Sequence, residues 1–235
     1  MVEDTVMNNT AKEAILQRIR AALGDEQTGW GARKKSARED TRNLKTERGY
    51  RTHSEMNKQQ RVRLFVRHVE EYKARVSEIS EQELPQTVSD ICSAEKVKKL
   101  VIPPGLDEKW LPGPESGLTY LSDEPDQLSH DELDNSDAVL TGCFRAVAQT
   151  GTIVLNAGLG QGRRALTLIP DFHICVVRRE QVTGIVPEVF WELEPVIREE
   201  GAPVTFISGP SATSDIELDR VEGVHGPRRL HVVIV

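Results

Sequence analysis

The sequence has few cysteines, few aromatic residues and no long apolar run. Its three cysteines, Cys92, Cys143 and Cys175, lie dozens of residues apart, which excludes a CxxC metal or cluster motif. An odd number of widely spaced thiols fits a reducing compartment and reduced, buried side chains. No apolar stretch approaches the roughly 20 residues that cross a bilayer, and the N-terminus lacks a basic region followed by an apolar one. We therefore expect a cytoplasmic protein without a membrane span.

Two nucleotide-binding motifs are also missing. A dinucleotide fingerprint needs GxGxxG between a strand and a helix, but Arg163 stands where the third glycine would follow Gly158 and Gly160. The phosphate-binding GxxxxGK[ST] motif does not occur in the chain. Since there is also no set of cysteines for a cluster and no sign of a flavin site, we expect no redox cofactor and no metal in this chain.

Acidic residues dominate the net charge of −7, but the charge is unevenly distributed. Residues 31–75 carry a net charge of +8, whereas the rest of the chain carries −15. Such a basic segment can bind nucleic acid, an acidic partner or the acidic body of its own chain. The last two interpretations are favoured, and no nucleic acid is expected, because aromatic interleaving and a recognisable nucleic-acid module are absent.

Two helices are predicted in the first third of the chain. Residues 10–24 place Ile15, Leu16, Ile19 and Leu23 on one stripe, and a polar linker follows to residue 52. Residues 57–79 form the strongest helical pattern, with an apolar stripe of Val62, Phe65, Val69, Tyr72, Val76 and Ile79. We therefore assign residues 1–80 to a helical extension with a basic linker, and residues 81–235 to an α/β domain.

Short apolar strands alternate with helices or turns after residue 83. Strands are predicted within 98–104, 117–121, 136–143, 150–158, 173–180, 202–209 and 228–235, and helical segments within 83–93, 144–149 and 180–201. This alternation is typical of an α/β fold with a mostly parallel central sheet that is buried on both faces.

Three glycine-containing loops are candidates for an anion site, because ligands of open α/β sheets bind in loops at the carboxyl ends of strands. Exposed backbone N–H groups, hydroxyls and arginine forks all bind carboxylate or phosphate. Each loop by itself is also consistent with ordinary turns and helix caps. The candidate ligand-binding residues are Thr150, Gly151, Thr152, Gly160, Gly162, Arg163, Arg164, Ser208, Gly209, Ser211, Thr213 and Gly226.

Candidates for acid–base catalysis are His225, Asp215 and Glu217. His225 lies in a glycine loop, where an imidazole can act as a base or contact an anion. Asp215 and Glu217 are two positions apart, and residues at this spacing diverge on a helix, so a cooperating pair is disfavoured. His173 and His231 fall in predicted strands, where a core or surface position is the simpler interpretation.

Three segments carry a family resemblance: AQTGTIVL, RRALTLIPDFHICVV and the terminal ISGPSATSDIELDRVEGVHGPRRLHVVIV. Together they resemble the LutC/YkgG family of LUD-domain lactate-utilisation proteins from about Leu84 to the C-terminus. The last segment is the most specific. One departure is Gln149, where the family pattern usually has Glu before TGT. If that carboxylate served as a base or metal ligand, this chain would lack the step.

The resemblance implies a three-layer sandwich like that of the NagB/RpiA/CoA-transferase superfamily. It also implies a role in oxidising L-lactate to pyruvate together with iron–sulfur partner subunits, with a small carboxylate or phosphate-bearing ligand on this chain. Two alternatives stay open. One is an autonomous enzyme of the same fold that acts on a phosphorylated sugar, an acyl-CoA or a folate. The other is a non-catalytic scaffold or regulatory subunit, which the basic N-terminal region and the heptad-like helix suggest.

Overall fold

The structure is a computed structural model that describes residues 16, 49–199, 201–213, 221–222 and 225–235. Contacts divide the chain into two units, Met1–Tyr50 and Arg51–Val235. The predicted helix at residues 10–24 and most of the predicted linker lie outside the described residues, as do Asp215 and Glu217. Every helix and strand whose bounds the structure describes lies in the second unit.

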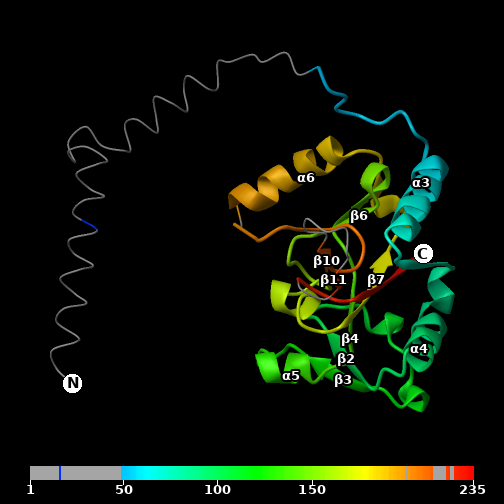
Figure 1. Cartoon of the computed structure of the whole chain (residues 1–235), viewed down its shortest axis with the longest axis vertical. Coiled ribbons are helices and arrows are strands. Elements are labelled where there is room, and N and C mark those ends of the chain that lie inside the picture. Colours follow the sequence, from blue (N-terminus) through cyan, green and yellow to red (C-terminus); the bar gives the residue numbers. More distant parts are fainter. Residues whose placement is uncertain (1–15, 17–48, 200, 214–220, 223–224) are drawn as a thin grey trace. The chain divides into compact units, whose positions relative to one another are not determined.

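A six-stranded parallel sheet forms the centre of the unit, in the order β1-β12-β7-β4-β2-β3 (Figure 1). Its strands are β1 (Arg75–Glu78), β2 (Lys99–Ile102), β3 (Thr119–Ser122), β4 (Ala138–Thr141), β7 (Phe172–Val177) and β12 (Arg229–Ile234). β4 and β7 are buried along their whole length, as expected for strands covered on both faces. The predicted α/β class with a mostly parallel central sheet is confirmed.

A second, four-stranded sheet has the order β8-β5-β6-β9. It comprises β5 (Arg145–Val147), β6 (Thr152–Leu155), β8 (Val182–Thr183) and β9 (Thr205–Ile207). β6 runs antiparallel to both of its neighbours, β5 and β9. A short antiparallel pair, β10 (Ala212–Thr213) and β11 (Val221–Glu222), follows β9.

The helices cover the outer faces of these sheets. They are α3 (Lys58–Glu71), α4 (Leu84–Ala94), α5 (His130–Asp134) and α6 (Val186–Glu199). α4 packs on one face of the parallel sheet through Leu84, Val88 and Ile91. α3 and the inner face of the second sheet pack on the opposite face, and α6 covers the outer face of the second sheet. The apolar core is therefore divided between the layers, and one buried cluster joins α3, the inner face of the second sheet and the parallel sheet.

The helix predicted at residues 57–79 is shorter in the structure. Asn57 and Gln60 form a reciprocal capping box at its start, but it ends at Glu71. Lys73 then takes a left-handed conformation, with φ of 65°, which a continuing helix cannot accommodate. Val76 belongs to β1 and pairs with Val232 of β12, so the helical continuation to residue 79 was wrong. Edge pairing with the sheet overrides an apolar spacing that also fits a helix.

Two other predicted helical segments contain strands. Within residues 144–149, Arg145–Val147 form β5, which pairs with β6, and the short 3-10 helix Ala148–Thr150 follows. Within 180–201, β8 precedes α6. The predicted division at residue 80 also differs from the contact division at Tyr50, since α3 and β1 pack within the unit Arg51–Val235.

Candidate functional site

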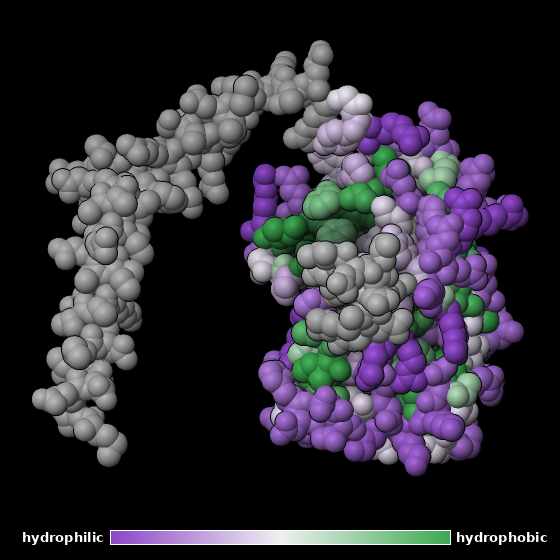
Figure 2. Space-filling model, in the orientation of Figure 1, coloured by the Kyte–Doolittle hydropathy of each residue, from purple (hydrophilic) through white to green (hydrophobic). Residues whose placement is uncertain are grey.

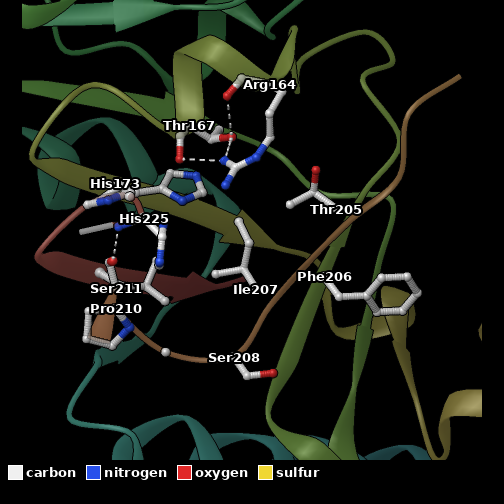
Figure 3. Close-up of a pocket in the computed structure, with 14 residues that line it drawn as sticks. Arg164, Thr167, His173, Thr205, Phe206, Ile207, Ser208, Pro210, Ser211 and His225 are labelled. Atoms are coloured by element: carbon white, nitrogen blue, oxygen red, sulfur yellow. Dashed lines mark hydrogen bonds between the residues drawn. The ribbon is translucent and has the colours of Figure 1, made fainter. Parts of the chain in front are cut away.

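A polar cavity of about 220 Å³ lies beside β9, at the amino ends of β7 and β12 (Figure 3). This volume is below the roughly 300–1,000 Å³ of pockets for drug-sized ligands, so it suits a small metabolite. Its walls come from the 3-10 helix Arg164–Thr167, from β9 and from the segments on either side of the β10–β11 pair. Besides Arg164 and Thr167, the lining residues are His173, Thr205, Phe206, Ile207, Ser208, Gly209, Pro210, Ser211, His225, Gly226, Pro227 and Leu230.

Arg164 supplies the positive charge of this cavity. One terminal nitrogen of its guanidinium donates to the carbonyl and to the hydroxyl oxygen of Thr167, at 3.0 and 3.2 Å. Its Nε and second terminal nitrogen have no hydrogen-bond partner among the described residues, none of which forms an ion pair with it. Partial burial lowers the pKa of Arg164 from its ordinary value, but an arginine keeps its charge in proteins. The free edge of the fork can therefore bind a carboxylate.

Two imidazoles complete the polar lining. His173 is 1% exposed, and its Nε2 lies 2.7 Å from the hydroxyl of buried Thr141. His225 is exposed and comes from the opposite wall, so that its ring, the His173 ring and Arg164 converge on one space (Figure 3). Two imidazoles and a guanidinium around a small space favour a ligand with an anionic group and a second polar oxygen.

The terminal motif builds the wall that holds His225. The Ser211 N–H donates to the Pro227 carbonyl at 2.8 Å, and the Ser211 hydroxyl accepts from the His225 N–H at 3.0 Å. These two bonds join the segments before β10 and after β11 at the cavity wall. Ser211 thus acts through the backbone it fixes. Thr213 lies in β10, next to this wall.

The polar character continues beneath His173. Cys175 lies two residues further along β7, with Cys143 beside it, and both thiols are buried and free. A hydrogen bond from Cys143 lowers the pKa of Cys175 to about 5, with His173 contributing, whereas the pKa of Cys143 is raised. Negative charge in this pair therefore favours Cys175, on the same side of the strand as His173.

The first predicted loop does not line the cavity. Gly151 has φ of +58°, and a Cβ there would lie 2.8 Å from the backbone carbon of His68 in α3. Its glycine is thus required by close helix packing. Thr152 is buried and lies 2.7 Å, hydroxyl to hydroxyl, from both Thr150 and Ser208. Ser208 lines the cavity, and its hydroxyl is held in place by Thr152, which is in turn held by Thr150.

The second predicted loop divides between two places. Gly160 and Gly162 lie at the carboxyl end of the parallel sheet, where the Gly160 N–H donates to the Pro104 carbonyl and the Gly160 carbonyl accepts from the Gly142 N–H. Arg163 donates two hydrogen bonds, of 2.9 and 3.0 Å, to the buried carboxylate of Asp123, and it also donates to the Leu128 carbonyl. The fork of Arg163 is satisfied inside the protein, so only Arg164 of the tandem pair faces the cavity.

The expectation that all three loops meet at the carboxyl ends of strands was wrong for this cavity. The carboxyl ends of β2, β3 and β4 are occupied by residues 156–163, whereas His173 and Leu230 stand at the amino ends of β7 and β12. The physical reason is the antiparallel β5–β6 pair, which sends the loops after these two strands to opposite ends of the second sheet. The structure brings together Arg164, Ser208, Gly209, Ser211, His225 and Gly226.

Sequence reasoning missed His173, Thr141, Thr167 and Thr205. The segment RRALTLIPDFHICVV held two of them, but a histidine within an apolar strand carried no signal of a cavity. Gln149 is exposed and lines a different hollow, beside α3, so its change from the family's usual Glu does not alter this cavity. Among the described residues there is no group of three His, Cys, Asp or Glu side chains arranged for a metal ion. Nor does any described helix have the length and apolarity to cross a membrane.

An α/β architecture with a small cationic cavity between a parallel and a mixed sheet is thus the class that fold and site define. The sequence profile of the LUD domain matches residues 62–235, most of the chain. The chain belongs to the LUD domain family.

Several proteins are similar to this chain in sequence. "Lactate utilization protein C" of Deinococcus radiodurans is 50% identical over 165 residues, which cover 70% of this chain and 74% of that protein. The protein of the same name from Halalkalibacterium halodurans is 33% identical over 108 residues, covering 45% of this chain and 46% of the other. A crystal structure of a DUF162 family protein from D. radiodurans has a TM-score of 0.65 at 39% identity, and covers 77% of this chain and 99% of that one.

Proposed function

We propose that this protein serves lactate utilisation by binding a small carboxylate, L-lactate or pyruvate, in the cavity at Arg164. The observation that carries the proposal is the partly free guanidinium of Arg164 facing two imidazoles in a cavity of about 220 Å³. The relationship to proteins named lactate utilization protein C supports the choice of ligand. A carboxylate binds the free edge of the fork, and the imidazoles face the 2-hydroxyl or 2-oxo group.

The electrons of lactate oxidation are assigned to iron–sulfur partner subunits in this proposal. Removal of two electrons needs an acceptor, and a cluster held by four thiolates needs more cysteines than the three in this chain. The role of this chain is then to bind and orient the carboxylate within a cytoplasmic complex. Its own residues supply the charge of Arg164 and the imidazoles of His173 and His225.

The direct test is ligand binding by the purified full chain. A ligand at a hundred times its dissociation constant stabilises a protein by about 2.7 kcal/mol, which raises the melting temperature by about 5–10 °C for a domain of this size. We expect such a rise with L-lactate or pyruvate, and a much smaller rise with the Arg164→Ala variant at the same ligand concentration. A rise with phosphorylated sugars or coenzyme A alone would contradict the carboxylate and favour an autonomous enzyme of the same fold.

A second test separates the pathway from the ligand. A strain that lacks this gene and any paralogue is grown on L-lactate, and the gene is restored as wild type or as Arg164→Ala. We expect growth only with the wild type, and co-purification of iron–sulfur proteins with both. Normal growth of the deletion strain would overturn the role in lactate utilisation. Loss of co-purification with the variant would show that Arg164 serves assembly instead of ligand binding.

A further inference from the structure

Apolar side chains are exposed on α6 and on β9, where Phe206 also lines the cavity. Phe190 and Trp191 are 53% and 55% exposed, Ile197 is 45% exposed, and Phe206 of β9 is 41% exposed. The rings of Phe190 and Phe206 stack with centroids 5.6 Å apart. Figure 2 shows apolar surface gathered over α6. Large apolar patches on a soluble protein mark interaction surfaces, and Trp and Phe are enriched at their centres. We call these four side chains the α6 patch.

Carboxylates border the α6 patch. Glu194 and Glu199 are exposed on the same helix. Glu194 is paired with Arg198 one turn further on, at 2.7 Å, whereas Glu199 forms no ion pair with any described residue. Glu192 is held by Arg145 of β5. The patch thus presents apolar side chains with acidic groups at its edge.

A surface of the opposite character lies along α3. Two hollows share Met56, Gln60 and Leu64 as their floor, and we call their combined surface the α3 groove. Arg51, Arg63 and Arg67 line it, against the single carboxylate of Glu55. Neither Arg51 nor Arg63 forms an ion pair with any described residue. Arg67 pairs with Glu71 at 3.7 Å, and one of its terminal nitrogens lies 3.3 Å from Nε2 of His68. The groove therefore offers an apolar floor between positive charges, two of which have no carboxylate partner in the described part of the chain.

The α6 patch and the α3 groove are neighbours. α3 and α6 both pack against β8. At the end of the groove, the Ser54 N–H donates to the Glu188 carboxylate in the first turn of α6, at 2.7 Å. Backbone donors from Ser54, Ile185 and Gly184 outweigh partial burial and lower the pKa of Glu188, so this carboxylate is charged near neutral pH. Because the α6 patch and the α3 groove adjoin, a single partner can contact both surfaces.

We propose that the partner is a second copy of this chain, and that the α6 patch of each copy packs in the α3 groove of the other. Apolar side chains with acidic edges meet an apolar floor with basic edges, so the two surfaces are complementary in charge and in polarity. Because the two surfaces adjoin, a two-fold axis between them closes both contacts at once. A single contact without that axis would propagate into an open chain.

The test measures the mass of the full-length protein over a wide dilution series, by sedimentation equilibrium and light scattering. We expect a reversible dimer. Trp191→Glu places a charge at the centre of the patch, and Arg63→Glu reverses a charge of the groove. Each substitution is expected to raise the dimer dissociation constant about tenfold or more, and the effect of Arg63→Glu is expected to shrink at high salt.

Mixing the two variants distinguishes the proposed contact from others. Each variant alone has one defective surface in both contacts of its dimer. A mixed dimer of Trp191→Glu with Arg63→Glu places both changes in one contact and keeps the other contact intact. Because a contact that one substitution has already broken loses little more from the second, the mixture is expected to dimerise more tightly than either variant alone. If the mixture gains nothing although the wild type dimerises, the patches do not meet the grooves and the proposal is overturned.

Two substitutions of the same kind serve as controls on other surfaces. Leu159→Glu changes a side chain that is 82% exposed on the glycine loop, and Lys109→Glu reverses an exposed charge after β2. Both are expected to leave the dissociation constant unchanged, while circular dichroism confirms that all four variants are folded. A wild-type protein that stays monomeric at every concentration would overturn the dimer, and so would controls that weaken it as much as Trp191→Glu.

Discussion

The two ends of the six-stranded sheet differ in the partners that they offer to an arginine side chain. At the carboxyl end, Arg163 is held by buried Asp123, and glycines pack the loop 156–162 over β2 and β4. Near the amino ends of β7 and β12, Arg164 donates to the carbonyl and the hydroxyl of Thr167 and faces a cavity. Among the described residues, Arg163 has a carboxylate partner and Arg164 has none. The proposed ligand site therefore lies at the arginine that has no carboxylate partner in the described part of the chain.

Removing the partnered arginine is expected to have the largest effect. Arg163→Ala leaves the Asp123 carboxylate, 4% exposed, without its cation, and loss of one member of a buried pair costs about 3 kcal/mol of unfolding free energy. Urea denaturation measures the change. Ligand binding by the folded fraction should remain. Arg163→Ala combined with Asp123→Asn should recover part of the loss, and a single variant as stable as the wild type would show that the pair contributes nothing.

Removing the unpartnered arginine is expected to show the reverse. Arg164→Ala should reduce carboxylate affinity about 10- to 100-fold, since a hydrogen-bonded charge contributes about 1.5–3 kcal/mol. Its unfolding free energy should change by less than about 1 kcal/mol, because no buried carboxylate loses its partner. Isothermal titration calorimetry with L-lactate and pyruvate gives the affinity. If Arg163→Ala lowers the affinity as much as Arg164→Ala does, the contrast between the two arginines fails.

The glycine loop at the carboxyl end can be tested by adding a single methyl group. In Gly162→Ala the new Cβ would lie 2.5 Å from a methyl carbon of Leu166 and 2.8 Å from Pro103, at φ of +73°. We expect a loss of about 1–2 kcal/mol from strain and crowding together. Gly201→Ala, with φ of +61° and open space, is the matched control for strain alone. Equal losses of unfolding free energy in the two variants would show that crowding around the new methyl group contributes nothing.

The α4-facing side of β12 gives a smaller effect that depends on pH. Burial and the nearby charge of Arg75 lower the pKa of His231 from its ordinary 6.5 to about 4. The unfolded chain therefore binds more protons than the folded one between these values, so stability is full above pH 6.5 and falls as the pH drops toward 4. Unfolding free energies at about pH 7 and about pH 5 should differ less in His231→Gln than in the wild type. An unchanged difference would assign the pH dependence to other groups.

The smallest effect is expected at Gln149. Its side chain is exposed outside the cavity, so Gln149→Glu should change carboxylate affinity within experimental error and stability by less than about 0.5 kcal/mol. Calorimetry and urea denaturation give both values. A large gain in affinity would show that the family's usual carboxylate reaches the ligand, and would move the site away from Arg164.

The sequence predicted those parts of the fold that depend on local pattern. Apolar runs such as residues 173–177 can be buried only in the interior of a sheet, and their alternation with helices predicts a mostly parallel arrangement. Pattern failed where one spacing fits two structures. Val76 extends the helical stripe of α3, but pairing with Val232 fixes it in a strand. Arg145–Val147 is too short to identify without its partner β6.

The candidate site shows the same division between local and tertiary information. The sequence by itself determined which residues can bind an anion, because glycine, hydroxyl and guanidinium chemistry is local. Only the tertiary structure decided which of them face a cavity. Arg163 and Arg164 have the same side chain and are adjacent in sequence. Asp123, 40 residues before Arg163, forms an ion pair with Arg163, whereas no described carboxylate pairs with Arg164. His173 lies in the candidate site because β7 pairs with β4, and this pairing places the His173 ring beside Thr141. The two residues are 32 positions apart in the sequence, so only the tertiary structure brings them into contact.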